Sequence, residues 1–519
     1  ENTRWPWLSR REKTGRVHLE SGWSRLELAR QEFLPFSRVS YKQQVLVEQS
    51  EPGLVITDEH SRLCEPRSGP WRVQFENPLR LTMVCQGEFC AASEGQPLAF
   101  SACLELYAGH DLARLELTLH NPRAANHPGN AWDLGDPGSH WFADLSLRLG
   151  LAAGSGRRLC LQPEPGHDIL ETDSCLRLYQ DSSGGVNWGS SNHVNHRGEI
   201  PLRFPGYEVR MDGKGVLRDM RAQPVLAAEG EAGAIGMSLS RFWQNFPKGL
   251  QAEGHSLSLE LFPKEHNDLF EIQGGEQKTH TVYLACADRA EDVFARLARA
   301  RQPIEVVPDG EWMRRSRAVP GVVPAELGSL RSASEEQPGT EGTGAEELGS
   351  CYTAYEDLIA TAAYGPSSFF QRREDIDEYG WRHFGDLYAD HEAVFHKGGE
   401  TFVSHYNNQY DVIKGALCQF WRTGGSQWYR LAAELADHVS DIDIYHTDRD
   451  RYQYNHGLFW HTDHHLHAAT ATHRAISREH ARYKDTIGGG PAPDHNYATG
   501  LCLMYWMTGR KTTWSGIST

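Results

Sequence analysis

The chain has 519 residues, of which 39% are hydrophobic and 23% charged, and its formal net charge is −17 at pH 7. This length predicts two or three domains, and the composition is that of a globular protein. No apolar run approaches the ~20 residues that span a bilayer, which argues against membrane insertion. The acidic balance, without a Lys/Arg stripe, argues against nucleic-acid binding. An anionic substrate would therefore need a local basic pocket.

The ten cysteines lie far apart in the sequence. They show neither a Cys-x-x-Cys pair nor zinc-like spacing, so no disulfide framework and no cysteine metal site is predicted. The chain starts at Glu1, with no charged and then apolar leader. We therefore expect that a signal peptide was removed or left out.

The first three hundred residues predict antiparallel β structure. Apolar and polar residues alternate with period two, broken by Gly, Pro and Asn, over residues 100–106, 113–119 and 145–151. Further strands are expected at 256–262 and 279–285. Such alternation is typical of half-buried strands, so we expect a β-sandwich or two β domains.

Beyond this region the pattern changes. Residues 319–350 are rich in Pro, Gly, Ser, Ala and Glu, which predicts a linker or mobile loop. Two apolar stripes at helical spacing follow and predict helices. The first contains Tyr406, Tyr410, Ile413, Leu417 and Phe420, and the second contains Trp428, Leu431, Leu435 and Val439.

A repeat in the helical region predicts its architecture. Phe-Trp-Arg-Thr-Gly ends at Gly424 and Tyr-Trp-Met-Thr-Gly ends at Gly509, 85 positions later (509 − 424). Each Gly suits a left-handed helix C-cap, and the spacing leaves room for two helical hairpins. We expect an α/α toroid, with an ordinary helical bundle as the alternative. The second repeat runs to the last residues, so the toroid is expected to be truncated.

Candidate sugar-contacting residues gather in polar and aromatic segments, because sugars are bound by aromatic faces, amides, carboxylates and Arg. In the loop 121–142, Trp132 is a candidate platform, whereas Asp136 fits a turn network equally well. The loop 180–197 is either a sugar site or a hydrogen-bonded surface loop. The other segments are 241–249, 372–386, 405–411, 456–467 and 494–497.

Lys248 is a candidate general base. Lys is scarce in this Arg-rich chain, and Lys248 follows Trp243, Asn245 and Phe246. A Lys held among aromatic rings can have a lowered pKa and accept a proton. The alternative is an ordinary solvated lysine.

Histidines in the helical region predict a polar cleft. His461, His464 and His465 share one helix face, but Thr462 stands where a zincin needs Glu, so cleft lining is favoured over zinc. His405 and Asn408 fall off the apolar stripe and are the expected polar lining.

Several long motifs resemble the exo-rhamnogalacturonan lyase family, polysaccharide lyase family 26 and its bacterial relatives, over nearly the whole chain. The motifs are WDLGDPGS (132–139), QDSSGG (180–185), GWRHFGD (380–386), HYNNQYD (405–411), DIDIYHT (441–447) and FWHTDHH (459–465).

The resemblance implies a multidomain β and α fold: a small, incomplete N-terminal β-barrel-like domain (1–80), a central antiparallel β-sandwich (81–318), the linker (319–350) and an α/α toroid (351–519). It places the cleft between the last two domains. It also implies eliminative cleavage of rhamnogalacturonan I, which leaves an unsaturated galacturonate end, and a secreted or periplasmic location, with the cytoplasm left open.

A lyase must neutralise the uronate carboxylate, remove the C5 proton and protonate the C4 leaving oxygen. The clamp candidates are Arg382, Arg372, Asn192 and Asn408; the base candidates are Lys248 and His193; the acid candidates are His405, Tyr410 and His461. The residues expected to bind substrate are Trp132, Asp181, Trp188, Asn192, Asn245, Arg372, Trp381, Asp386, Trp460, His464 and His465.

Two other functions fit the same residues. A toroid glycoside hydrolase would use paired carboxylates such as Asp375 and Asp386. A non-catalytic glycan-binding protein would use the aromatic rings without a base. The expected partner in every case is an acidic polysaccharide or oligosaccharide. No metal ligand and no cofactor is predicted. The sequence does not decide whether a divalent cation is needed or which oligomeric state the protein has.

Overall fold

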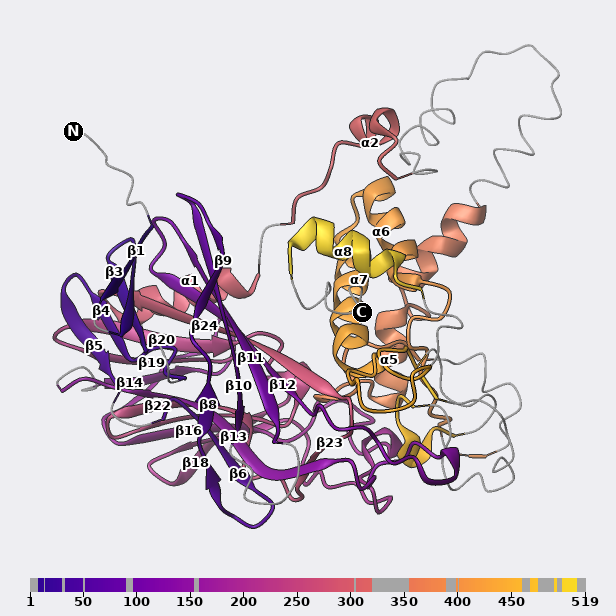
Figure 1. Ribbon diagram of the computed structural model, residues 1–519, viewed down its shortest axis with the longest axis horizontal. Coiled ribbons are helices and arrows are strands. Elements are labelled where there is room, and N and C mark those ends of the chain that lie inside the picture. The colour runs from indigo at the N-terminus through magenta and orange to yellow at the C-terminus, as the bar shows by residue number, and fades with distance from the viewer. Residues whose placement is uncertain are drawn as a thin grey trace.

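The computed structural model combines a β-rich part with a helical part (Figure 1). It describes residues 8–13, 15–29, 33–49, 52–89, 97–153, 158–302, 305–319, 354–388, 398–399, 401–459, 467–474, 490–491 and 497–510.

The N-terminal sheet is an antiparallel meander in the order β1-β2-β3-β4-β5. Its alternating strands turn residues such as Leu19 and Leu28 into the core, both 0% exposed. Its strands are β1 (Ser9–Lys13), β2 (Arg16–Ser21), β3 (Ser24–Ala29), β4 (Arg38–Tyr41) and β5 (Gln44–Glu48). The family resemblance led us to expect a barrel-like domain; the described strands form an open sheet.

Two larger antiparallel sheets form a sandwich around the main hydrophobic core. The ten-stranded sheet has the order β15 (Leu170–Thr172), β14 (Arg158–Gln162), β19 (Val225–Gly230), β20 (Gly233–Leu239), β24 (Gln277–Ala287), β12 (Leu112–His120), β11 (Ala99–Tyr107), β10 (Arg80–Phe89) and β8 (Pro66–Ser68), with β9 (Arg72–Glu76) also on β10. The nine-stranded sheet has the order β18 (Lys214–Asp219), β17 (Tyr207–Met211), β16 (Cys175–Gln180), β21 (Lys248–Glu253), β22 (Ser256–Phe262), β13 (His140–Gly150), β6 (Leu54–Asp58) and β7 (Leu63–Cys64), with β23 (Phe270–Ile272) on β13.

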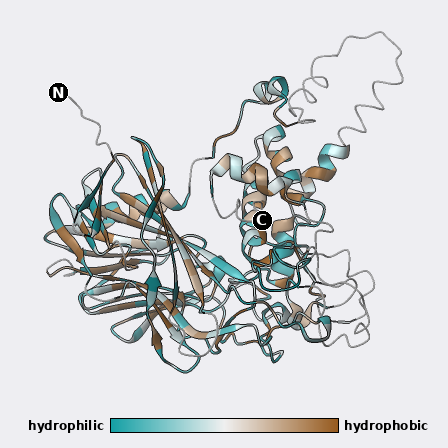
Figure 2. Ribbon diagram, viewed as in Figure 1, coloured by the Kyte–Doolittle hydropathy of each residue, from teal (hydrophilic) through white to brown (hydrophobic). Residues whose placement is uncertain are grey.

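The predicted strands are confirmed. The alternating segments are β11, β12, β13, β22 and most of β24, and hydropathy alternates along many strands in Figure 2. Leu145, Leu147 and Leu149 on β13 are at most 1% exposed. Burying each such side chain contributes about 1.5–3 kcal/mol.

The first domain boundary lies earlier than expected. β6 pairs with β13, and β8 and β9 pair with β10, so residues 54–76 belong to the sandwich sheets. The N-terminal sheet thus ends at Glu48 rather than near residue 80.

The helical elements are α1 (Ala290–Arg301), α2 (Gly310–Ser316), a helix over 354–363, α5 (Phe369–Ile376), α6 (Val412–Thr423), α7 (Ser426–His438), a π turn (Val439–Asp443) and α8 (Thr499–Thr508). Short 3-10 turns lie at Pro128–Asn130, Ser191–His193, Trp243–Asn245 and Ala469–Ala471. α1 packs Val293, Phe294 and Leu297 on the ten-stranded sheet. This helix was not predicted from the sequence, because the first three hundred residues were interpreted as β structure.

The helix expected from Tyr406 begins only at Val412. Asn407, Asn408, Tyr410 and Asp411 all have positive φ angles, between 50° and 61°, which end a helix rather than continue it. The Asp411 side chain accepts a hydrogen bond from Lys414 N and caps α6.

The predicted C-caps are confirmed, because Gly424 (φ 71°) and Gly509 (φ 65°) are left-handed and end α6 and α8. The described helices do not establish a closed ring, so the toroid stays a prediction. The expected linker at 319–350 lies outside the described residues, apart from its first position.

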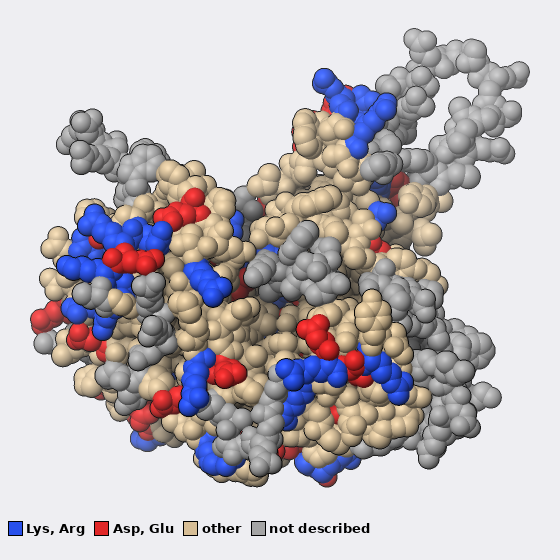
Figure 3. Space-filling model, in the orientation of Figure 1, with Lys and Arg blue, Asp and Glu red and all other residues tan. Residues whose placement is uncertain are grey.

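The two parts meet along β24 and the segment after α7. Asp441 accepts hydrogen bonds from Thr279 N and Oγ1, both at 2.8 Å, and Arg241 pairs with Asp437 at 2.6 Å. Basic and acidic residues are interspersed over the face in Figure 3. Among the described residues no helix has the length and apolarity needed to cross a membrane.

Candidate functional site

The segment after α5 carries the centre of the candidate site. Ser368 caps α5 at its start, and Asp377 (φ 54°) ends it with a left-handed residue. The chain then passes close to α7 at Gly385, where an added Cβ would lie 2.8 Å from His438 Cβ. Gly385 also has a φ of 114°, which favours glycine. The close approach brings residues 377–388 between the sandwich and α7.

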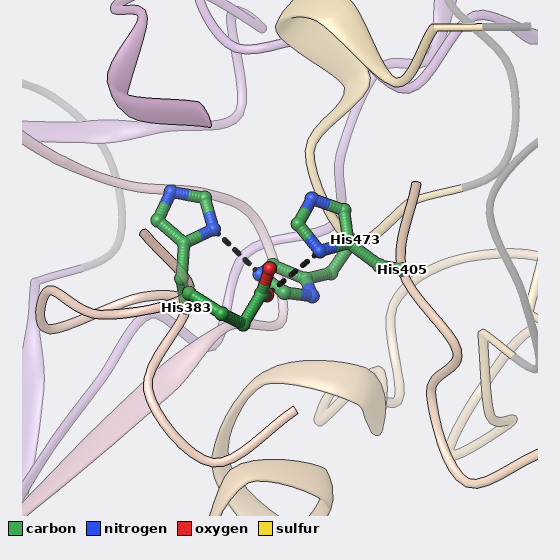
Figure 4. A group of neighbouring side chains, drawn as sticks. His383, His405 and His473 are labelled. Carbon is green, nitrogen blue, oxygen red and sulfur yellow. Dashed lines mark hydrogen bonds and ion pairs between the residues drawn. The ribbon is translucent and has the colours of Figure 1, made fainter. Parts of the chain in front are cut away.

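Three histidines from separate segments point toward one another in this region (Figure 4). His383 Nδ1 lies 2.8 Å from His473 Nε2, and His473 Nδ1 lies 3.1 Å from Asp386 Oδ2. His405 Nδ1 lies 2.9 Å from Glu378 Oε1. Hydrogen bonds therefore link His383, His473 and Asp386 in one chain and His405 with Glu378 in a second pair.

Burial sets the protonation of these groups. It lowers the pKa of His383 and of His473 well below the ordinary value, and the neighbouring imidazoles add to the effect. Burial also acts against the charged form of His405, but the Glu378 carboxylate outweighs it and raises the pKa of His405. The cluster thus holds one histidine favoured as a cation beside two favoured as neutral.

The histidine cluster has the donors of a metal site. One ligand atom from each of Glu378, His383, His405 and His473 can be chosen so that all lie within 4.8 Å of one another, and all four side chains are buried. A second possible group, Asp386, His438 and His473, shares one histidine with the first.

A small pocket adjoins the cluster between the β-rich and helical parts. Its volume is about 90 Å³, and its lining includes His193, Glu271, Trp381, Arg382 and His383. Pockets for whole drug-sized ligands measure about 300–1,000 Å³. This pocket would therefore take one chemical group rather than a whole ring system.

His193 is held by a buried carboxylate. Its Nε2 lies 2.7 Å from Asp377 Oδ2, and its ring packs against Phe246 at 5.2 Å between centroids. Next to it, Asn192 Nδ2 lies 3.4 Å from Glu378 Oε2, and Asn192 Oδ1 is buried without a hydrogen-bond partner in the described part of the chain. A base role for His193 and a polar role for Asn192 remain predictions that fit this placement.

Arg382 also lines the pocket. Its Nε donates to Glu276 Oε1 at 2.8 Å, and its Nη2 donates to the Glu271 carbonyl. The guanidinium stacks on Trp381, 4.3 Å from the ring centroid. Burial raises the pKa of the Glu271 carboxyl to about 7, although Arg382 acts in the opposite direction. The pocket therefore contains a fixed cation and a carboxyl that titrates near neutral pH.

Lys248 has the lowered pKa that the sequence suggested, but its amine is not accessible to a substrate. Burial, reinforced by Lys278, lowers its pKa well below the ordinary value. However, Lys248 is 0% exposed, its Nζ donates to Pro247 O at 3.0 Å, and it faces the Phe262 ring at 5.0 Å. A substrate cannot touch this amine in the structure, so it does not fit the role of base.

Two candidate acids lie outside the pocket. His405 is 0% exposed and belongs to the histidine cluster. Tyr410, in contrast, is 66% exposed and precedes α6. The expected clamp residue Asn408 is also 0% exposed, and its Oδ1 accepts a hydrogen bond from Ile413 N at the start of α6. Its observed role is to shape the turn.

Two more residues expected to bind substrate, Asp181 and Trp132, make their contacts inside the protein. The Asp181 carboxylate accepts hydrogen bonds from Arg203 N and Phe204 N. Trp132 is 2% exposed, because it lies in an aromatic cluster where His127 stacks on it at 4.5 Å. Neither placement fits direct contact with a sugar.

The remaining expected contacts are spread over the molecule. Asn245 donates to Arg241 O, Arg372 donates to Ser367 O, and Trp188 is half-buried. Asp386 is 0% exposed, within the cluster, whereas Asp375 is exposed on α5. Trp460, His461, His464 and His465 lie outside the described residues.

The comparisons with known proteins do not identify a family. No protein-family model matches the chain. No curated protein matches it either. Two solved structures that it resembles are a candidate aldose 1-epimerase from Klebsiella pneumoniae and the GH36 alpha-galactosidase AgaB from Geobacillus stearothermophilus, each with a TM-score of 0.32 and 10% identity.

The matches cover 57% of this chain and 86% of the Klebsiella protein, and 54% of this chain and 41% of AgaB. The chain thus spans less than half the length of AgaB. TM-scores of this size do not establish a shared fold or function.

Glu271, Glu378, His383 and His473 were not singled out from the sequence as site residues, although Glu378 and His383 lie in the candidate segment 372–386. Glu378 and His383 lie within or beside the motif around Arg382, and His473 lies six residues beyond the candidate segment 456–467 (473 − 467). The signal that unites them is spatial, because the cluster joins positions up to 95 residues apart (473 − 378).

Proposed function

We propose that the chain is a polysaccharide lyase that cleaves a uronate-containing polysaccharide such as rhamnogalacturonan I by β-elimination. The observation that carries the proposal is the pocket in which His193, Arg382 and Glu271 come together. These residues supply a base, a cation and a titratable acid, the three groups that the reaction needs. The family resemblance of the surrounding motifs supports the choice of substrate.

His193 is the proposed base. With Nε2–H donated to Asp377, Nδ1 carries the lone pair that can take the C5 proton of the uronate. Asp377 then stabilises the imidazolium that forms. Lys248, the other expected base, has no surface open to a substrate.

Arg382 is the proposed carboxylate clamp. Its Nε and Nη2 are held by Glu276 and the Glu271 carbonyl, while Nη1 has no hydrogen bond to a residue that the structure describes. A held guanidinium can neutralise the uronate carboxylate before proton removal and stabilise the enediolate as charge develops.

Glu271 is the proposed acid. A carboxyl with a pKa of about 7 carries a proton on a substantial share of molecules at neutral pH. It can give that proton to the C4 oxygen as the C4–O bond breaks. The electron pair of the C5–H bond becomes the C4=C5 double bond, which balances the reaction without an added reagent.

The hydrolase alternative gains no support from its carboxylate pair. Asp386 is 0% exposed and hydrogen-bonded to Leu387 N and Asn407 N, whereas Asp375 is exposed on α5. An inverting or retaining pair must flank one bond from a common cleft.

The test is to incubate the chain with rhamnogalacturonan I and with homogalacturonan and to follow the ultraviolet absorbance of the unsaturated uronate. His193→Ala should lower turnover by ~10² or more while keeping substrate affinity. Arg382→Ala should weaken both affinity and turnover. The control is His60→Ala at an exposed position of the β-rich part. Saturated products, or full activity of His193→Ala, would refute the mechanism.

A further inference from the structure

We propose that Glu378, His383, His405 and His473 bind one divalent transition-metal ion, with zinc as the reference ion. The inference goes beyond the proposed lyase function and does not depend on it. It rests on four potential ligand atoms that lie within 4.8 Å of one another.

The donor set suits such an ion. Three imidazoles and one carboxylate are typical ligands of zinc and of neighbouring transition metals. Bonds of about 2.1 Å in a tetrahedron place ligand atoms about 3.4 Å apart. The observed separations of 2.8 Å (His383 to His473) and 2.9 Å (His405 to Glu378) need only a small expansion to reach this spacing.

The surroundings orient the ligands as metal sites do. Asp386 accepts from His473 Nδ1, which leaves the His473 Nε2 lone pair turned toward His383. Asp386 is itself fixed, because its Oδ1 accepts from Leu387 N and Asn407 N. This carboxylate–histidine pair is the usual support of a histidine ligand.

The charge of the region also favours a cation. Glu378 and Asp386 are each 0% exposed, and each lies against an imidazole. Arg382, Arg474 and Lys278 are the other cations that act on this region. Burying several carboxylates is costly unless a positive charge accompanies them. A divalent ion supplies two positive charges at the point where the donors converge.

The site would form one wall of the pocket, because His383 belongs to both. A group bound in the pocket would approach the ion from the side of His383. A carboxylate or hydroxyl oxygen of that group could add to the four protein donors as a fifth ligand.

The test measures metal directly. The chain is stripped with a chelator, dialysed against zinc, manganese or nickel, and analysed for bound metal, and its affinity is then titrated. We expect about one ion per chain for at least one of the three. Glu378→Gln, which keeps the side-chain shape, should weaken binding by more than 100-fold, and Asp386→Asn by about 10–100-fold.

His438→Gln distinguishes the two overlapping donor groups, because His438 belongs only to the second. It should leave the affinity within a few fold of wild type. The matched control is His120→Gln, since His120 also lies against a buried histidine, His446, at 6.1 Å between ring centroids. Bound metal should also raise the melting temperature of the wild type and not that of Glu378→Gln.

The proposal is overturned if the wild type retains less than about one tenth of an equivalent of all three metals, or if Glu378→Gln binds as the wild type does. Loss of binding in His438→Gln with retention in Glu378→Gln would also overturn it. None of these readouts uses a sugar, so a failed lyase assay leaves the metal result intact.

Discussion

Replacing Lys248 with Met should stabilise the protein, and by more at neutral than at alkaline pH. Lys248 is 0% exposed, and burial with the nearby Lys278 lowers its pKa well below 10.5. The folded state therefore favours the neutral amine, whereas the unfolded chain favours the protonated one. Because the unfolded state binds more protons at this position, the contribution of Lys248 to stability rises with pH up to about 10.5.

The size of the expected stability difference follows from the binding of one proton to Lys248. Between the lowered pKa of the folded state and the ordinary value, Lys248 alone raises the free energy of unfolding by up to about 1.4 kcal/mol per pH unit. Met has a similar length and no charge, so the variant lacks this slope. The advantage of Lys248→Met should thus be largest at the lowest pH of the series.

The assay is urea unfolding at pH 7, 8, 9 and 10, followed by far-ultraviolet circular dichroism. Lys214→Met at an exposed position on β18 is the matched control. Equal pH slopes for wild type and Lys248→Met, or a less stable variant at pH 7, would refute the reasoning. A ~10²-fold loss of turnover in Lys248→Met would instead indicate that Lys248 is the general base.

Three further variants test other parts of the structure. Burial favours the protonated Glu271 carboxyl in the folded state, so its contribution to the free energy of unfolding falls by up to about 1.4 kcal/mol per pH unit between pH 4.5 and about 7. Glu271→Gln should lack this fall, and urea unfolding across that range measures it. Leu147→Ala should cost about 2–5 kcal/mol in the same assay, because Leu147 is 0% exposed, and an unchanged midpoint would contradict the sandwich core. Gly385→Ala should lower the melting temperature, because its φ is 114° and a Cβ would clash with Glu434 O of α7. The clash should also displace the nearby ligand His383 and lower the affinity for metal; wild-type values for both would contradict the close approach to α7.

Local patterns predicted the strands well, because period-two alternation reports one buried face directly. They failed before α6, where Tyr406 and Tyr410 match helical spacing but Asn408 and Asp411 adopt left-handed φ angles. Spacing alone carries no information about such a turn.

The candidate site was predicted only in part. His193 and Arg382 were expected and line one pocket. Trp132 was expected to face a sugar, yet it is 2% exposed because His127 and other aromatic rings surround it. Burial of a loop residue depends on distant segments, and so does the meeting of His383 with His473.

Elimination on an acidic polysaccharide is tested most directly by the ultraviolet absorbance of rhamnogalacturonan I during incubation with the wild type and with His193→Ala. We predict that absorbance rises with the wild type, as conjugated double bonds form, and stays near the blank with the variant. Saturated reducing ends without a rise in absorbance, or equal rates for both proteins, would contradict it.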